Sequence, residues 1–311
     1  MKSFLFQYVL LLNTVILFMS ADSCGQSSSK MVSPLPGAKP NGFTLMESGT
    51  TGVNFINRLE EKDLVRNHSL MNGSGIALAD VDGDGLCDLY FCGMADSNRL
   101  YRNLGNWKFE EVTDAFGVSC GGQLSKGAEF ADVDGDRDPD RMVSSMSSGI
   151  RLFNNHKGVG FQETTELSSD LVSRFGTTSM ALADIDGDGD LDLYAANFGE
   201  RLVLKSGARI STRMVGGKTR VTGRYADKIK IINGNLVEFG APDALFLNDG
   251  AGHFRRVSWS QGFFNNQDGS VMEEPSDFGL AVMFYDVNQD RYPDIFVCND
   301  FHTPDRLWIN D

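Results

Sequence analysis

The sequence predicts an all-β protein built from repeated antiparallel sheets, and three observations lead to this prediction. The 311 residues include 34 glycines and 22 phenylalanines but 8 prolines, a composition typical of short strands joined by tight turns. Apolar residues make up 41% of the chain, which is enough to fill a sizeable core. The third observation is an acidic segment of nine residues that occurs four times.

The acidic segment recurs at a regular spacing. Its copies are DVDGDGLCD at residues 80–88, DVDGDRDPD at 132–140, DIDGDGDLD at 184–192 and DVNQDRYPD at 286–294. They start 52, 52 and 102 residues apart, so the last interval holds one period and an insertion of about one more. Four copies in register indicate an internal repeat rather than chance.

Each acidic loop lies among apolar segments in a fixed order. One strand-like segment precedes the loop, one follows it, a third ends in asparagine, and a fourth begins with phenylalanine in three of the units. In chain order these segments cover 76–79, 89–92, 100–103, 109–113; 128–131, 142–143, 152–155, 161–165; 180–183, 193–196, 245–248, 254–258; and 281–285, 295–298, 307–310. We therefore expect one four-stranded antiparallel sheet per unit. Because such a sheet cannot bury two apolar faces alone, the units are expected to stack radially as a β-propeller with four visible blades.

The loops carry the residues expected to bind metal. Oxygen-bearing side chains stand at positions 1, 3, 5 and 9, and the main-chain carbonyl at position 7 can add a ligand, a pattern of hard donors that suits Ca²⁺. Two carboxylates about 4 Å apart repel by about 4 kcal/mol at an effective dielectric constant of 20, so four on one loop need a cation. Asp-Gly sequences also form tight turns without metal, but such a turn needs one Asp rather than four in register.

The predicted ligands serve up to four calcium ions. The side-chain ligands are Asp80, Asp82, Asp84 and Asp88; Asp132, Asp134, Asp136 and Asp140; Asp184, Asp186, Asp188 and Asp192; and Asp286, Asn288, Asp290 and Asp294. The carbonyl ligands are those of Leu86, Asp138, Asp190 and Tyr292.

The four sites are not expected to be equal. Gly85 and Gly189 stand at position 6, where a sharp turn favours glycine, whereas Arg137 and Arg291 stand there in the second and fourth loops. We expect weaker binding in those two loops. The fourth should be weakest, because Asn288 replaces a carboxylate and the glycine at position 4 is missing.

The first residues predict export. Lys2 precedes an apolar stretch over residues 4–19, and small residues follow it, which is the pattern of a signal peptide over residues 1–23. A single membrane helix is the alternative, although the stretch is short of the roughly 20 apolar residues that a full span needs. A flexible linker over 24–41 is expected next, and Cys24 resembles the lipidation site of bacterial lipoproteins. We therefore expect a secreted or cell-surface protein, with a lipid anchor at Cys24 left open.

Charge and cysteine content restrict the partners. The formal net charge of −14 disfavours nucleic acid and anionic membrane surfaces, because the field of the protein repels phosphate. Cys87, Cys92, Cys120 and Cys298 lack the spacing of a zinc site. Disulfides and buried free thiols are equally good accounts of these four cysteines.

A basic insertion interrupts the third unit at residues 198–242. Between residues 205 and 230 it holds eight basic residues and one acidic residue. Ile229 to Ile232, Asn233-Gly234 and Leu236 to Phe239 predict a hairpin with a tight turn. Its charges are either a contact surface for an anionic partner such as an acidic polysaccharide, or a solvated hairpin that complements acidic surface nearby.

No HExxH motif and no phosphate-binding loop accompanies these features. We expect a non-catalytic recognition or adhesion module that binds an extracellular protein or acidic glycan. The alternative is a carbohydrate-active enzyme, a polysaccharide lyase or hydrolase, on a calcium-stabilised propeller.

The acidic loops, the LYRN-type segments and the opening TGVNFINRL and NGSGIALAD resemble the FG-GAP or VCBS repeat family of integrin-α-like propellers. Within it, the resemblance is greatest to exported proteins similar to cartilage acidic protein, which often carry an ASPIC/UnbV domain. The resemblance covers about residues 42–311 and implies a propeller, commonly seven-bladed, with calcium on hairpin loops of one face and partners bound by other loops.

Two features depart from that pattern. Only four acidic loops are present, and the sequence ends at Asp311, within a repeated motif. We expect these blades to be part of a larger ring. In the alternative, residues 43–46 return as a fourth strand of the last unit and close a four-bladed ring.

Overall fold

The computed structural model describes residues 43–59, 61, 68–156, 158–172 and 175–311. The expected signal peptide, the whole of the expected linker and Cys24 lie outside these residues. The chain divides into two units, Met1–Met46 and Glu47–Asp311, and the fold described below is that of the second.

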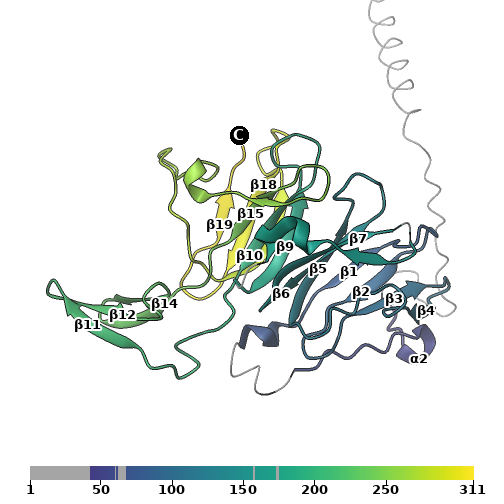
Figure 1. The fold of residues 1–311 in the computed structure, drawn as a ribbon, viewed down its shortest axis with the longest axis horizontal. Coiled ribbons are helices and arrows are strands. Elements are labelled where there is room, and N and C mark those ends of the chain that lie inside the picture. Colours follow the sequence, from purple (N-terminus) through teal and green to yellow (C-terminus); the bar gives the residue numbers. More distant parts are fainter. Residues whose placement is uncertain (1–42, 60, 62–67, 157, 173–174) are drawn as a thin grey trace, which may run out of the picture. The chain divides into compact units, whose positions relative to one another are not determined.

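The second unit is all-β apart from short helical turns, as the sequence predicts (Figure 1). The first sheet holds β1 (Ile76–Ala79), β2 (Asp88–Phe91), β3 (Arg99–Asn103) and β4 (Phe109–Glu111); the second holds β5 (Ser125–Ala131), β6 (Asp140–Ser145), β7 (Gly149–Asn155) and β8 (Phe161–Glu163). The third holds β9 (Thr177–Ala183), β10 (Asp192–Asn197), β15 (Ala244–Leu247) and β16 (Arg255–Arg256), and the fourth holds β17 (Gly279–Tyr285), β18 (Asp294–Asn299) and β19 (Arg306–Trp308). The helical turns are α2 (Ser48–Thr51), η1 (His68–Asn72), η2 (Thr165–Leu171) and η3 (Trp259–Gln261).

In every sheet the strands pair antiparallel in chain order. Each acidic loop joins the first strand of a sheet to the second. In the first sheet, Ala79 pairs with Asp88, so the loop begins and ends at one end of the β1–β2 hairpin. The equivalent pairs close the other three loops, and the repeat therefore places each loop at the same position of its sheet.

Apolar cores lie between consecutive sheets. Tyr90 and Leu100 of the first sheet pack with Val143 and Phe153 of the second. A second core joins the second and third sheets, and a third joins the third and fourth. The sheets thus stack face to face, as successive blades of a propeller do.

The fourth sheet leaves one apolar face exposed. In this sheet the side chain of Leu307 is 48% exposed. The equivalent leucines of the other three sheets are buried, with exposed fractions of 0% for Leu100, 0% for Leu152 and 2% for Leu245. Among the described residues the four sheets form no closed ring, and residues 43–46 form no strand. The described residues of the fourth sheet form three strands, and the alternative in which residues 43–46 add a fourth stays a prediction.

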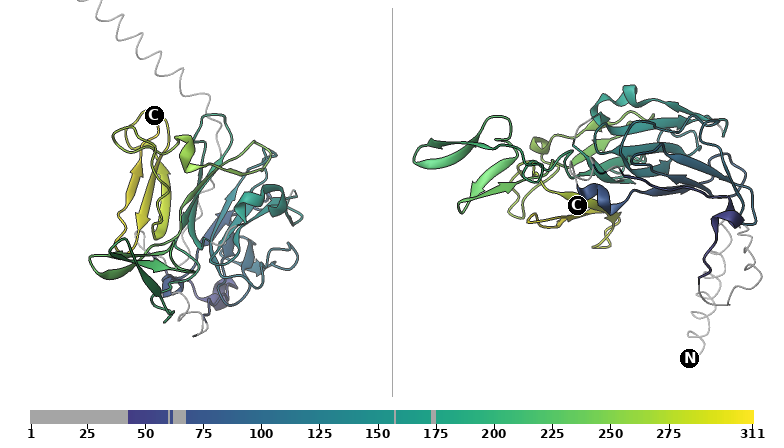
Figure 2. Two further views of the ribbon diagram at one scale, coloured as in Figure 1. Left: turned by 60° about the vertical axis from the view of Figure 1, so that its left-hand side comes forward. Right: turned by 90° about the horizontal axis from the view of Figure 1, so that it is seen from below.

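The insertion contains two hairpins that project away from the four sheets (Figure 2). One pairs β13 (Ile229–Ile232) with β14 (Asn235–Glu238) through the expected Asn233-Gly234 turn, where both residues have positive φ. The other, which the sequence analysis missed, pairs β11 (Ser211–Val215) with β12 (Lys218–Thr222). Cys87, Cys92, Cys120 and Cys298 are free thiols.

Candidate metal centre

The first aspartate of each loop organises the turn. Asp80 accepts hydrogen bonds from the backbone N–H groups of Asp84 at 3.0 Å and Gly85 at 2.8 Å. Position 1 accepts from the position 6 N–H in the other loops as well, at 2.9 Å for Asp132, 3.1 Å for Asp184 and 2.9 Å for Asp286. The four loops therefore share one backbone path, whatever residue stands at position 6.

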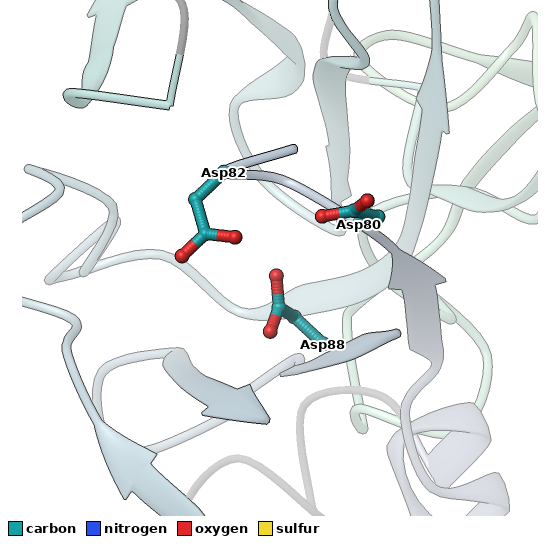
Figure 3. A group of neighbouring side chains, drawn as sticks. All are labelled: Asp80, Asp82 and Asp88. Carbon is teal, nitrogen blue, oxygen red and sulfur yellow. The ribbon is translucent and has the colours of Figure 1, made fainter. Parts of the chain in front are cut away.

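Three of the loops bring together carboxylates that could hold a metal ion. In the first loop, oxygen atoms of Asp80, Asp82 and Asp88 lie within 4.8 Å of one another, and Figure 3 shows the three carboxyl groups turned toward a common space. The same criterion is met by Asp132, Asp134 and Asp136 and by Asp184, Asp186 and Asp192. Within the described residues no such group forms in the fourth loop, where Asn288 replaces the aspartate at position 3.

The aspartate at position 9 is buried in all four loops. In the first loop, Asp88 accepts the N–H of Val81 at 3.0 Å and the N–H of Asn103 at 2.7 Å. Burial raises the pKa of the equivalent Asp140 to about 7 and of Asp192 to about 6, against the lowering effect of their backbone hydrogen bonds. A buried carboxylate gains most from a neighbouring cation, because desolvation penalises its charge.

The aspartate at position 5 accepts the same hydrogen bond in all four loops but joins a carboxylate group in only the second of these loops. Asp84, Asp188 and Asp290 each accept the N–H two residues ahead, at 2.8 to 3.0 Å. Asp136 accepts the equivalent bond at 2.9 Å and also joins the carboxylate group of its loop. Asp140, in turn, stays outside that group. Every ligand role expected from the sequence stays a prediction. The carboxylate groups leave out Asp84, Asp140, Asp188, Asp286, Asn288, Asp290 and Asp294 and the carbonyls of Leu86, Asp138, Asp190 and Tyr292.

Backbone geometry gives a physical reason for unequal loops. Position 6 has a left-handed φ in all four, at 84° for Gly85, 96° for Gly189, 76° for Arg137 and 83° for Arg291. Gln289, at position 4 of the fourth loop, also has a positive φ of 66°. The second loop therefore holds one non-glycine residue in a conformation that favours glycine, and the fourth holds two.

Two polar neighbours of the loops were not predicted from the sequence. Arg102 lies 3.9 Å from a carboxylate oxygen of Asp82, and Asn154 donates to Asp134 at 2.6 Å. Both residues stand at the same place in their third strands, one residue before the terminal asparagine. Only the alignment of the repeats could have indicated them, since each lies 20 residues from its loop partner in sequence.

Two overlapping segments, residues 80–143 and 132–195, match the model of the FG-GAP-like repeat. They contain the first three acidic loops, which are also the loops that gather carboxylates. The expected FG-GAP-like repeats are thereby supported, while the narrower likeness to cartilage acidic protein stays a prediction. No curated protein matches the sequence.

Among solved structures, the chain is similar to one described as the crystal structure of BBS1N in complex with ARL6DN, soaked with lead. The identity is 11%, the TM-score is 0.29, and the match covers 71% of this chain and 61% of that chain. The chain thus spans less than two thirds of the length of that relative, and the TM-score is too low to define a shared fold. No helix in the described residues is both long and apolar enough to cross a membrane.

Proposed function

We propose that this chain binds calcium through the acidic loops of its stacked sheets and acts outside the cell as a recognition module. The observation that carries the proposal is that the acidic loops of three sheets each gather three carboxylates whose oxygens lie within 4.8 Å of one another. Calcium is the preferred ion because the donors are hard oxygens and Ca²⁺ accepts them in a variable coordination geometry, whereas Mg²⁺ demands a near-ideal octahedron.

The arrangement fits a cation better than a turn without metal. Three carboxylates at this separation repel one another, by about 4 kcal/mol per pair at 4 Å and an effective dielectric constant of 20. In the first loop the carboxylates at positions 1, 3 and 9 all accept backbone N–H groups, but these neutral donors bring no positive charge to offset the repulsion. A divalent ion would supply charge neutralisation and fix the loop.

Calorimetric titration with calcium tests the proposal. Position 3 offers the mildest change, because an asparagine there keeps the Oδ1 atom that accepts the position 5 N–H in the first loop. We expect the chelator-treated chain to bind calcium, and the triple variant Asp82→Asn/Asp134→Asn/Asp186→Asn to lose that binding. Asp114→Asn, at an exposed aspartate outside the loops, is the control and should bind as the unsubstituted chain does. Equal binding by the triple variant and the control would refute the proposal.

The partner proposed for this module is an acidic glycan bound by the β11–β12 hairpin, with an extracellular protein as the other candidate. Support comes from charge and placement. Arg213 stands directly opposite Arg220 in the hairpin, and among the described residues neither forms an ion pair. An exported binding protein also agrees with the FG-GAP-like repeats, the expected signal peptide and the predicted lack of catalysis. Export and the lack of catalysis are parts of this proposal.

A further inference from the structure

An asparagine ends the third strand of each of the four stacked sheets or follows it closely, and its backbone N–H binds the acidic loop of the same sheet. The four residues are Asn103, Asn155, Asn248 and Asn310. Each N–H donates to the position 9 aspartate, over 2.7 Å from Asn103 to Asp88, 2.8 Å from Asn155 to Asp140, 2.9 Å from Asn248 to Asp192 and 2.9 Å from Asn310 to Asp294. A side-chain substitution leaves this backbone bond available.

The side chains of three of these asparagines bind a different loop, that of the preceding sheet. The Nδ2 of Asn155 donates to the carbonyl of Val81 at 3.0 Å, that of Asn248 to Val133 at 2.8 Å, and that of Asn310 to Ile185 at 2.8 Å. In every case the acceptor is position 2 of the loop, between the expected ligands at positions 1 and 3. The contact therefore crosses a sheet boundary at the edge of a metal site.

The residue at position 2 also forms a hydrogen bond through its backbone N–H. Its N–H donates to the position 9 aspartate of its own loop, at 3.0 Å for Val81, 3.1 Å for Val133 and 3.1 Å for Ile185. Both peptide groups that flank position 2 are thus fixed by hydrogen bonds. Because these peptides carry the Cα atoms of positions 1 and 3, the two bonds set the spacing of two ligands before any ion arrives.

The fourth loop supplies an internal comparison. In the described part of the chain no asparagine amide donates to the carbonyl of Val287, its position 2 residue, which is 49% exposed against 1% for Val81 and 2% for Val133. This is also the loop in which the described residues form no carboxylate group, and it differs further in having Asn288 at position 3. The three loops that receive an asparagine from the next sheet are the three that gather carboxylates.

We infer that Asn155, Asn248 and Asn310 are positioning residues, each of which completes the metal site of the preceding sheet. The inference rests on the proposed calcium binding and adds to it that every site depends on two sheets. Residues that orient metal ligands through hydrogen bonds typically change affinity by 10- to 100-fold when removed. Calcium affinity at one loop should therefore respond to a side chain more than a hundred residues away, since Asn248 lies 115 residues from Val133.

The test separates the loops by disabling two of them at position 3. Asp82→Asn/Asp186→Asn leaves the second loop, and Asp82→Asn/Asp134→Asn leaves the third. Calorimetric titration of each double variant with calcium then measures one principal site. Added to the first double variant, Asn248→Ala should weaken binding by at least about tenfold.

The expected asymmetry excludes a general structural effect. Asn248 belongs to the sheet of the third loop, yet its side chain contacts the second, so Asn248→Ala should leave the third loop within about twofold. Asn248→Asp, which keeps the shape but replaces the donor, should weaken the second loop as alanine does. Asn103→Ala is the matched control, because the Asn103 amide donates to Cys87 within its own sheet at 2.9 Å, and it should leave the second loop unchanged.

The outcomes are distinguishable. Calcium binding by the double variants with no effect of Asn248→Ala or Asn248→Asp on the second loop would overturn the inference and leave the proposed function standing. Equal weakening of the second and third loops would also overturn it. Absence of calcium binding by the unsubstituted chain would overturn both. If Asn248→Ala failed to fold, Asn155→Ala measured on the first loop alone would decide, with the same tenfold loss expected.

Discussion

Single residues determine how much backbone strain each loop carries when it adopts the conformation that all four loops share. Position 1 accepts the position 6 N–H in all four loops, so position 6 is held in the left-handed region even where it is arginine. A side chain there costs roughly 1–2 kcal/mol relative to glycine. The sequence could predict this inequality, because Gly85 and Gly189 align with Arg137 and Arg291.

The substitution Arg137→Gly should therefore stabilise the second loop. We expect the free energy of unfolding to rise by about 1 kcal/mol, since the relief of the strained φ exceeds the extra entropy of glycine in the unfolded chain. Urea denaturation of the chelator-treated chain measures this effect. Gly85→Arg is the reciprocal variant and should lose a similar amount. A fall in stability on Arg137→Gly would show that the arginine side chain makes contacts that outweigh the strain.

Other residue roles were beyond the reach of sequence analysis. The LYRN-type segments showed an asparagine in every unit, but they did not show that its amide reaches a loop of another sheet. That contact depends on how far one sheet is rotated relative to the next. No single segment encodes the rotation, since it follows from the packing of the cores between sheets.

Among the elements, strands were predicted best where the residues are continuously apolar, as in β1, whose expected and observed bounds agree. The sequence placed the second strand of the second sheet at residues 142–143, whereas β6 covers Asp140–Ser145. The difference arises because polar residues at both ends of this strand are buried. Among them is Arg141, whose guanidinium lies 4.0 Å from the Phe153 ring centroid and 4.6 Å from that of Tyr90. A prediction based on hydrophobicity ends a strand at a charged residue, although cation–π contacts can make that residue part of the core.

The β11–β12 hairpin was missed for the opposite reason, because its strands are polar and exposed. Successive strand residues alternate between faces, so Arg213, Arg220 and Lys218 share one face while Thr212 and Thr219 stand on the other. Like charges placed directly opposite destabilise a hairpin. An anionic partner on that face would remove the penalty, which is the physical basis for proposing an acidic glycan.

Charge changes on the two faces test this proposal. Arg213→Gln/Arg220→Gln and Thr212→Glu/Thr219→Glu alter the net charge by the same amount on opposite faces. On an immobilised sulfated glycan, we expect the arginine pair to elute at lower salt than the unsubstituted chain. The threonine pair should elute close to the unsubstituted chain. Equal shifts for both pairs would show that net charge alone governs retention, and no retention of any variant would exclude this class of glycan.

At the scale of the whole molecule, metal loops and apolar cores are separate sources of stability. Three apolar cores join the four sheets, and none of them includes a loop carboxylate. The sheets should therefore stay folded without calcium. The loops add stability only in the bound state, because a ligand that binds the native chain stabilises it by about 2.7 kcal/mol when its concentration is 100 times Kd.

Removal of calcium should consequently lower the melting temperature without abolishing the fold. By calorimetry we expect the chain in excess calcium to melt several degrees above the chelator-treated chain, while circular dichroism at 25 °C shows the same β content in both. The triple variant Asp82→Asn/Asp134→Asn/Asp186→Asn should melt at one temperature in both buffers, since its loops no longer link calcium to folding. A calcium-dependent shift that persisted in the triple variant would place the responsible ion outside the three carboxylate groups. No shift in the unsubstituted chain would mean that the stacked cores alone hold the loops in place.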